Sequence, residues 1–262
     1  MGPDPNFGFG PLEAEFWRLV FVMTRIGAAM VAAPLFGAGS VPAQVRVIAS
    51  GALAVLVCGW LPAVQPPPNL LSINGMLAVA GEVLVGLSLG FILQLAFAAP
   101  VMAAEVIGGS MGMSMATAVD PNSGTQSPAL GQYFTVVMTL IFLATGAHLH
   151  WFGLIIESYR TFPPGHTWLG PDRIEAVSAF AAMMFTAAVS IAFPVSLVLL
   201  LAQVVTGVLS RSAPSLNLFA LGLPAGVLAG LAALILSGPA LTDMLTQLSM
   251  QAITQAGEII AR

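Results

Sequence analysis

Lysine is absent from this chain, and charge of either sign is scarce. Among its 262 residues there are 7 basic side chains and 11 acidic ones, so 7% of the residues are charged and the formal net charge is −4. Without lysine there can be no G-x-x-x-x-G-K phosphate-binding loop, and the acidic balance argues against nucleic acid as a partner. Soluble domains carry about 25% charged residues. The scarcity of charge therefore indicates an integral membrane protein.

Cysteine is almost absent too. Cys58 stands alone inside an apolar run, which excludes an internal disulfide and is typical of a small buried hydrophobic side chain. The first residues, MGPDPNFGFG, lack the basic region of a secretory signal. We therefore expect the first apolar segment to stay in the mature protein.

Apolar runs dominate what is present: 58% of the residues are hydrophobic and the mean hydropathy is +0.95. A helix that crosses a membrane needs about 20 such residues. Turn signals and charges separate six runs of about this size, which predicts an all-α polytopic membrane protein. The runs are Phe16–Phe36, Val45–Leu61, Gly75–Ala98, Leu130–Ile156, Val177–Leu209 and Asn217–Ser237.

The last segment, Leu241–Arg262, follows Gly238-Pro239 and has a different pattern. Its apolar residues recur at helical spacing among polar ones, at Leu241, Leu245, Leu248 and Ala252. This predicts a separate amphipathic helix that lies along the membrane or docks on a partner.

One stretch between apolar runs, Glu105–Pro128, is rich in glycine, methionine, serine and threonine. We predict a re-entrant or plug-like loop, because irregular backbone at membrane depth is tolerated only where protein or water surrounds it. Glycines would let this loop bend, unbranched methionines would form a yielding gasket, and an Asp-Pro pair would mark its hinge or stop. These residues are Gly108, Gly109, Met111, Gly112, Met113, Met115, Asp120 and Pro121.

Two sets of glycines recur every four residues and predict helix faces that pack closely on a neighbour within the chain or in another subunit. One set, Gly86 and Gly90, follows Glu82, and the other is Gly222, Gly226 and Gly230. Glu82 lies near the middle of its run, so it needs a partner or a proton, or forms part of an ion path.

Other polar side chains also need partners. Arg18 and Arg25 lie seven residues apart, on one face of the first apolar run, where each needs protein, water or a headgroup beside it. Arg211 precedes Pro214 and suits a helix end or an ion pair between subunits. We expect Glu105 and Asn217 to contact neighbouring subunits as well.

Two other classes of function stay open. Gly108 to Gly112 matches the G-x-S-x-G pattern of serine hydrolases around Ser110, with His148 and His150 later in the chain, but that pattern requires a strand-to-helix elbow. The same histidines suggest a metal pair, with neither a cysteine nor a nearby carboxylate to complete it. A secondary transporter would bind a proton or solute at Glu82, Glu105 and Asp120.

Several motifs in a fixed order resemble the FliR family of flagellar and type III secretion export-gate proteins. They are VPAQVR at 41–46, GEVLVGLSLGF at 81–91, MGMSMATAVDP at 111–121, IIESYRTFPPG at 155–165 and SLNLFALGLP at 215–224. The resemblance implies a non-enzymatic subunit without cofactors in the bacterial inner membrane, at the flagellar basal body. It also implies FliP-like, FliQ-like and FlhB-like partners and a pore for unfolded flagellar proteins, with an injectisome component as the alternative.

The same resemblance implies a single domain, 1–262, with three parts. Residues 1–176 would be FliP-like, 177–240 would form a FliQ-like helical hairpin, and 241–262 would be an amphipathic tail. The loop Gly108–Pro128 would project into the lumen of the pore as a plug.

Overall fold

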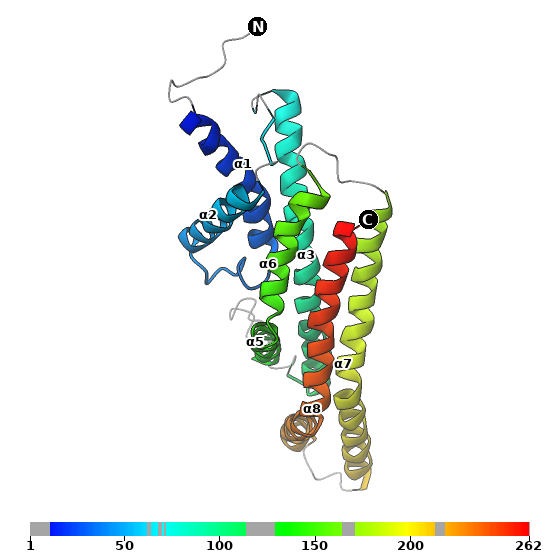
Figure 1. Cartoon of the computed structure of the whole chain (residues 1–262). Coiled ribbons are helices and arrows are strands. Elements are labelled where there is room, and N and C mark those ends of the chain that lie inside the picture. The colour runs from blue at the N-terminus through cyan, green and yellow to red at the C-terminus, as the bar shows by residue number, and fades with distance from the viewer. Residues whose placement is uncertain are drawn as a thin grey trace. The chain divides into compact units, whose positions relative to one another are not determined.

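A computed structural model of the chain describes residues 11–61, 64–67, 70, 72–113, 129–163, 171–212 and 218–261. Every regular element among these residues is an α-helix (Figure 1). The helices are α1 (Pro11–Ala32), α2 (Ala43–Trp60), α3 (Ile73–Ser110), α5 (Ala129–Ala144), α6 (Ala147–Thr161), α7 (Pro171–Ser212) and α8 (Leu218–Ala261).

The chain forms two compact units that are not continuous in sequence. Unit 1 comprises Met1–Leu95, Gly146–Phe180 and Ala252–Arg262, and unit 2 comprises Ala96–Thr145 and Ala181–Gln251. Helices α3, α7 and α8 each contribute residues to both units. The division predicted at residues 176 and 240 stays a prediction.

Among the described residues, four helices are long and apolar enough to cross a membrane: α2, α3, α7 and most of α8. The bent pair α5 and α6 would supply a fifth span. The chain is thus an all-α polytopic membrane protein, as predicted. Helix α1, expected to span as Phe16–Phe36, is not among the four, because every 18-residue stretch of it includes Glu15, Arg18 and Arg25.

The predicted span Leu130–Ile156 is wrong as a single helix. It consists of α5 and α6, which meet at an angle of 70°. Between them Gly146 has φ +71°, in the left-handed region that a glycine enters without steric cost. The apolar run continues through this break, so hydropathy alone did not indicate it.

The C-terminal segment also differs from the prediction of a separate helix after Gly238-Pro239. Helix α8 runs from Leu218 to Ala261 with Pro224 and Pro239 inside it. A proline removes one backbone hydrogen bond and favours a kink, but it does not have to end a helix in a membrane protein. The apolar face that includes Leu245 and Ala252 is buried within the chain, each side chain being 1% exposed.

The unusual stretch begins later than predicted. Glu105 to Ser110 belong to α3, and residues 111–113 form a turn. Glycines weaken a helix by only about 1 kcal/mol each, so the long apolar helix before them continues through Gly108 and Gly109. Four predicted site residues lie outside the described residues: Met115, Asp120, Pro121 and Asn217.

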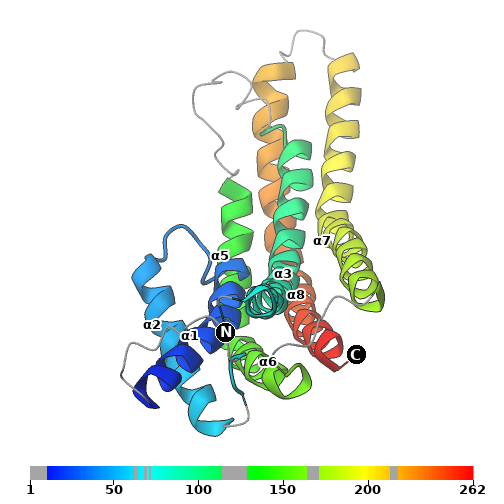
Figure 2. The same cartoon turned by 90° about the horizontal axis from the view of Figure 1, so that it is seen from above.

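Helix α1 positions the buried centre of unit 1. It packs against α2, with the two helices side by side in Figure 2. The buried residues of α1 recur at helical spacing and form a continuous stripe, which is Arg18, Phe21, Val22, Arg25, Ile26, Ala29 and Met30. This stripe places the guanidinium of Arg25 among apolar side chains, where its charge requires partners.

Candidate functional site

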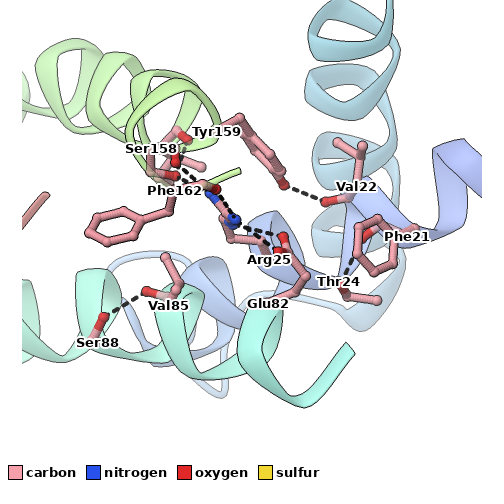
Figure 3. A network of polar contacts seen from close by, with 11 residues as sticks. Phe21, Val22, Thr24, Arg25, Glu82, Val85, Ser88, Ser158, Tyr159 and Phe162 are labelled. Atoms are coloured by element: carbon pink, nitrogen blue, oxygen red, sulfur yellow. Dashed lines mark hydrogen bonds and ion pairs between the residues drawn. The ribbon is translucent and has the colours of Figure 1, made fainter. Parts of the chain in front are cut away.

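Among the described residues of unit 1, the most completely buried charged side chain is Arg25, which is 1% exposed. Its Nε and Nη2 donate to the two carboxylate oxygens of Glu82 on α3, both at 2.8 Å (Figure 3). Glu82 is 2% exposed. A bidentate arginine–carboxylate pair has strong, directional hydrogen bonds, and each charge neutralises the other. The partner that the sequence analysis required for Glu82 is therefore Arg25.

Arg25 also holds the carboxyl end of α6. Its Nη1 donates to the carbonyl and hydroxyl oxygens of Ser158 at 2.7 and 3.0 Å, and its Nη2 donates to the carbonyl oxygen of Phe162 at 2.9 Å (Figure 3). A guanidinium has five N–H groups, and these contacts together with the Glu82 pair use all of them. A cation also suits the negative end of a helix dipole.

Tyr159 completes this centre. Its ring lies 4.1 Å below the Arg25 guanidinium carbon, and its hydroxyl donates to the carbonyl oxygen of Val22 at 2.6 Å. Helices α1, α3 and α6 are thus joined through one cation. We call Arg25, Glu82, Ser158, Tyr159 and Phe162 the Arg25 network.

Arg18, two turns earlier on the same face of α1, holds α2 in the same manner. It is 6% exposed, and it donates to the carbonyl oxygens of Cys58, Leu61 and Val64 at 3.0, 2.9 and 2.8 Å. Helix α2 ends at Trp60, so these are its last carbonyl groups and those just beyond it. The two arginines of α1 therefore fix the carboxyl ends of two other helices.

The glycine face that follows Glu82 lies against α1. A side-chain carbon on Gly86 would meet the carbonyl oxygen of Arg25, and one on Gly90 would lie 2.5 Å from the carbonyl oxygen of Ala29. Backbones approach this closely only where a side chain is missing. The neighbour of Gly86 and Gly90 is thus a helix of the same chain, and their spacing from Glu82 brings the carboxylate level with Arg25.

A second constellation, in unit 2, forms at the carboxyl end of α3. The N–H of Met113 donates to the carbonyl of Gly108, and that of Gly112 donates to the carbonyl of Gly109, both at 3.0 Å. Gly112 has φ +82°. These two bonds around a left-handed glycine are the Schellman ending of a helix. Gly108, Gly109 and Gly112 therefore form a defined turn at this point.

Met111, at the centre of that turn, packs on the glycine face of α8 and is 3% exposed. A side-chain carbon on Gly230 would lie 2.5 Å from its Cε, and one on Gly226 would lie 3.2 Å from its carbonyl oxygen. Gln203 of α7 donates from Nε2 to the carbonyl oxygen of Ser110 at 2.8 Å. We call Met111, Gln203, Gly226 and Gly230 the α3 seat.

Three further predicted contact residues, Gly222, Glu105 and Arg211, lie in open or exposed positions. Gly222 has open space where a side chain would be. Glu105 is exposed on α3, and the ion pairs found among the described residues do not include it. Arg211 is exposed in the last turn of α7, where a cation complements the helix dipole. Their roles at an interface stay predictions.

The geometry overturns the serine hydrolase alternative. Ser110 ends a helix instead of occupying a strand-to-helix elbow, and its hydroxyl donates to the carbonyl of Val106 at 2.9 Å. His150 lies 3.2 Å from the carbonyl oxygen of Gly146 through Nδ1, as suits a histidine at a helix start. Among the described residues, no group of three His, Cys, Asp or Glu side chains could hold a metal.

Gln203, Ser158 and Tyr159 were missed as site residues. Gln203 is an isolated amide in the apolar run of α7, and a polar residue in such a run usually marks a contact. Ser158 and Tyr159 lie within a motif quoted for the family resemblance, yet hydropathy gave no sign that they would face Arg25.

Comparisons with known proteins identify one family, and the match extends along almost the whole chain. The family model described as "Bacterial export proteins, family 1" matches residues 16–260. A "Flagellar biosynthetic protein FliR" of Escherichia coli K12 is 29% identical, covering 95% of this chain and 94% of its own length. The protein of the same name from Bacillus subtilis 168 is 34% identical, with 80% and 81% covered. This chain therefore belongs to the FliR family of bacterial export proteins.

Proposed function

We propose that this chain is a non-enzymatic integral membrane subunit of the flagellar type III protein export gate, and that it helps to form and close the pore for unfolded flagellar proteins. The observation that carries the proposal is the family match over residues 16–260. The relatives named above are flagellar proteins, which favours the flagellum over an injectisome. A transporter that binds a solute at Glu82 is disfavoured, because Arg25 neutralises that carboxylate.

The structure supports this function with a rigid buried scaffold. A pore subunit has to keep its helices in place while a polypeptide passes, and the Arg25 network joins three helices without leaving a guanidinium donor unused. Separating a buried pair of this kind would leave an uncompensated charge inside the chain, which resists movement of the helices that carry it. Such a network suits a fixed frame better than a moving part.

The partners in this proposal are FliP-like and FliQ-like proteins with a FlhB-like protein nearby, in the bacterial inner membrane. Support comes from large apolar side chains that are exposed along α7, including Phe185, Val189, Phe193, Leu197, Leu201 and Val205. Such a face requires lipid or other apolar helices around it. Residues 177–240, which include most of α7 and the first part of α8, would form the FliQ-like hairpin.

Closure of the pore is assigned to the segment that begins at the end of α3. Within the described residues it starts with the Gly108–Gly112 turn, and Met111 and Met113 provide flexible apolar side chains. We propose that Met115 continues this gasket and that Asp120 and Pro121 limit it. Methionine suits such a seal because it adapts its shape to varied surfaces.

The test of the proposed function is secretion by a strain that lacks this gene. Deletion should abolish hook and filament proteins in the medium while the cells continue to synthesise them, and the intact gene on a plasmid should restore secretion. An empty plasmid is the matched control. Normal secretion and swimming by the deletion strain would refute the proposal.

A further inference from the structure

The α3 seat differs in construction from the glycine face in unit 1. Gly86 and Gly90 lie against the backbone of α1, so that contact cannot open without moving a whole helix. At the seat, the three atoms nearest to a side-chain carbon on Gly230 would be Cε, Cγ and Sδ of Met111, all of them side-chain atoms, and one on Gly226 would lie 3.2 Å from the Met111 carbonyl oxygen. An unbranched side chain can leave a bare glycine surface through its own rotations.

The polar part of the seat is also suited to release. The amide of Gln203 donates to the carbonyl of Ser110, one of the last carbonyls of α3, and this hydrogen bond is exposed. Where water surrounds it, as in the lumen of a pore, such a bond to a helix-end carbonyl can be exchanged for one to water at little cost, because neither group is left unsatisfied. While the Gln203 amide donates to this carbonyl, it fixes the orientation of the last turn of α3.

We propose that Gln203 and Gly230 are positioning residues that hold the last turn of α3 on α7 and α8 in the closed gate, and that this turn leaves the seat when the gate opens. This inference rests on the proposed export function. It assigns a role to Gln203, which no sequence motif indicated. It also means that the contact between Met111 and Gly230 breaks when the gate opens and forms again when it closes.

A reversible cross-link tests the joint directly. Cys58 is the only cysteine, so Cys58→Ser gives a cysteine-free chain into which Met111→Cys and Gly230→Cys are introduced. Membranes are treated with a mild oxidant and then with a maleimide reagent. A disulfide is detected because neither thiol then reacts with the maleimide. We expect the oxidised protein to form it and secretion to fall at least tenfold, with recovery after a reductant. The cysteine-free chain under the same treatment sets the reference level.

The matched control pairs Met111→Cys with Leu228→Cys. Leu228 lies two residues before Gly230 on α8 and is 68% exposed, so no disulfide should form there. Failure of the Met111 and Gly230 pair to cross-link would refute the seat. A disulfide that leaves secretion unchanged would refute release. If the intact gene itself does not restore secretion, the export function has failed instead, whatever the cross-link shows.

A second measurement separates positioning from folding. Gln203→Glu keeps the shape of the side chain but removes its N–H donors, so we expect the assembled complex to leak ions severalfold more while it still co-purifies with its partners. Gly230→Ala should act alike by displacing Met111. Gly238→Ala is the control on α8, because that position has open space. Unchanged ion permeability with both Gln203→Glu and Gly230→Ala would overturn the positioning role.

Discussion

The guanidinium of Arg25 on α1 and the carboxylate of Glu82 on α3 form a bidentate ion pair with two bonds of 2.8 Å, fully enclosed by the chain. The remaining donors of Arg25 bind the carboxyl end of α6. One side chain therefore fixes three helices of unit 1, and changes at either partner should affect the folding of that unit.

Glu82→Gln should destabilise the protein strongly. The substitution leaves the buried charge of Arg25 without its counter-ion, which costs about 3–5 kcal/mol. The melting temperature in detergent and the amount of protein in membranes would report the loss. Glu157→Gln is the control, since its pair with Arg160 is about half exposed and contributes about 0–1 kcal/mol. If both variants lowered the melting temperature equally, the buried pair of Arg25 and Glu82 would not be essential to the fold.

Gly86→Ala should separate α3 from α1. The new methyl group would meet the carbonyl of Arg25 and would lie 2.9 Å from Cβ of Ala28, an overpacking that costs about 1–3 kcal/mol. Gly81→Ala, on the same helix with open space around it, should be neutral or stabilise by up to about 1 kcal/mol. Thermal unfolding of both variants measures the difference, and a harmless Gly86→Ala would refute the close approach.

Gly146→Ala tests the break between α5 and α6. A left-handed backbone costs residues with a side chain about 1–2 kcal/mol, and Gly146 has φ +71°. We expect a lower melting temperature, with Gly146→Asn less affected because asparagine tolerates this region. Gly153→Ala within α6, where space is open, should not lower it. An unchanged melting temperature for Gly146→Ala would contradict the left-handed backbone at this position.

Arg18→Lys should loosen the end of α2 without removing the positive charge. An ammonium group on a flexible stem cannot reproduce the planar fork that reaches the carbonyls of Cys58, Leu61 and Val64. Hydrogen exchange at residues 57–61 should become faster. Arg160→Lys provides the exposed control, and exchange rates that match those of the wild type would rule out this capping role.

The all-α fold and the membrane location could be predicted from the sequence, because apolar runs of about 20 residues with few charges are typical of membrane-spanning helices. The need of Glu82 for a partner was also evident, since an isolated charge in such a run is costly. The identity of that partner was not, because Arg25 lies 57 residues away and its other bonds reach 137 residues along the chain. Pairing at that range depends on how the helices pack, which no local pattern encodes.

The errors concerned helix boundaries. Glycine and proline both disfavour helices, yet the helix is interrupted at Gly146 and continues through Pro239. Packing of the surrounding residues decides such cases. Gly108 and Gly109 likewise suggested irregular backbone, but they form the last regular turns of α3 before the left-handed Gly112.

The measurement that tests the central claim most directly is the ion permeability of membranes containing the assembled complex without Met111–Met115. If this segment helps to close a protein-conducting pore, the deletion should make the complex leak ions or small molecules while its partners still co-purify with it in mild detergent. Unchanged permeability with normal assembly would contradict the account.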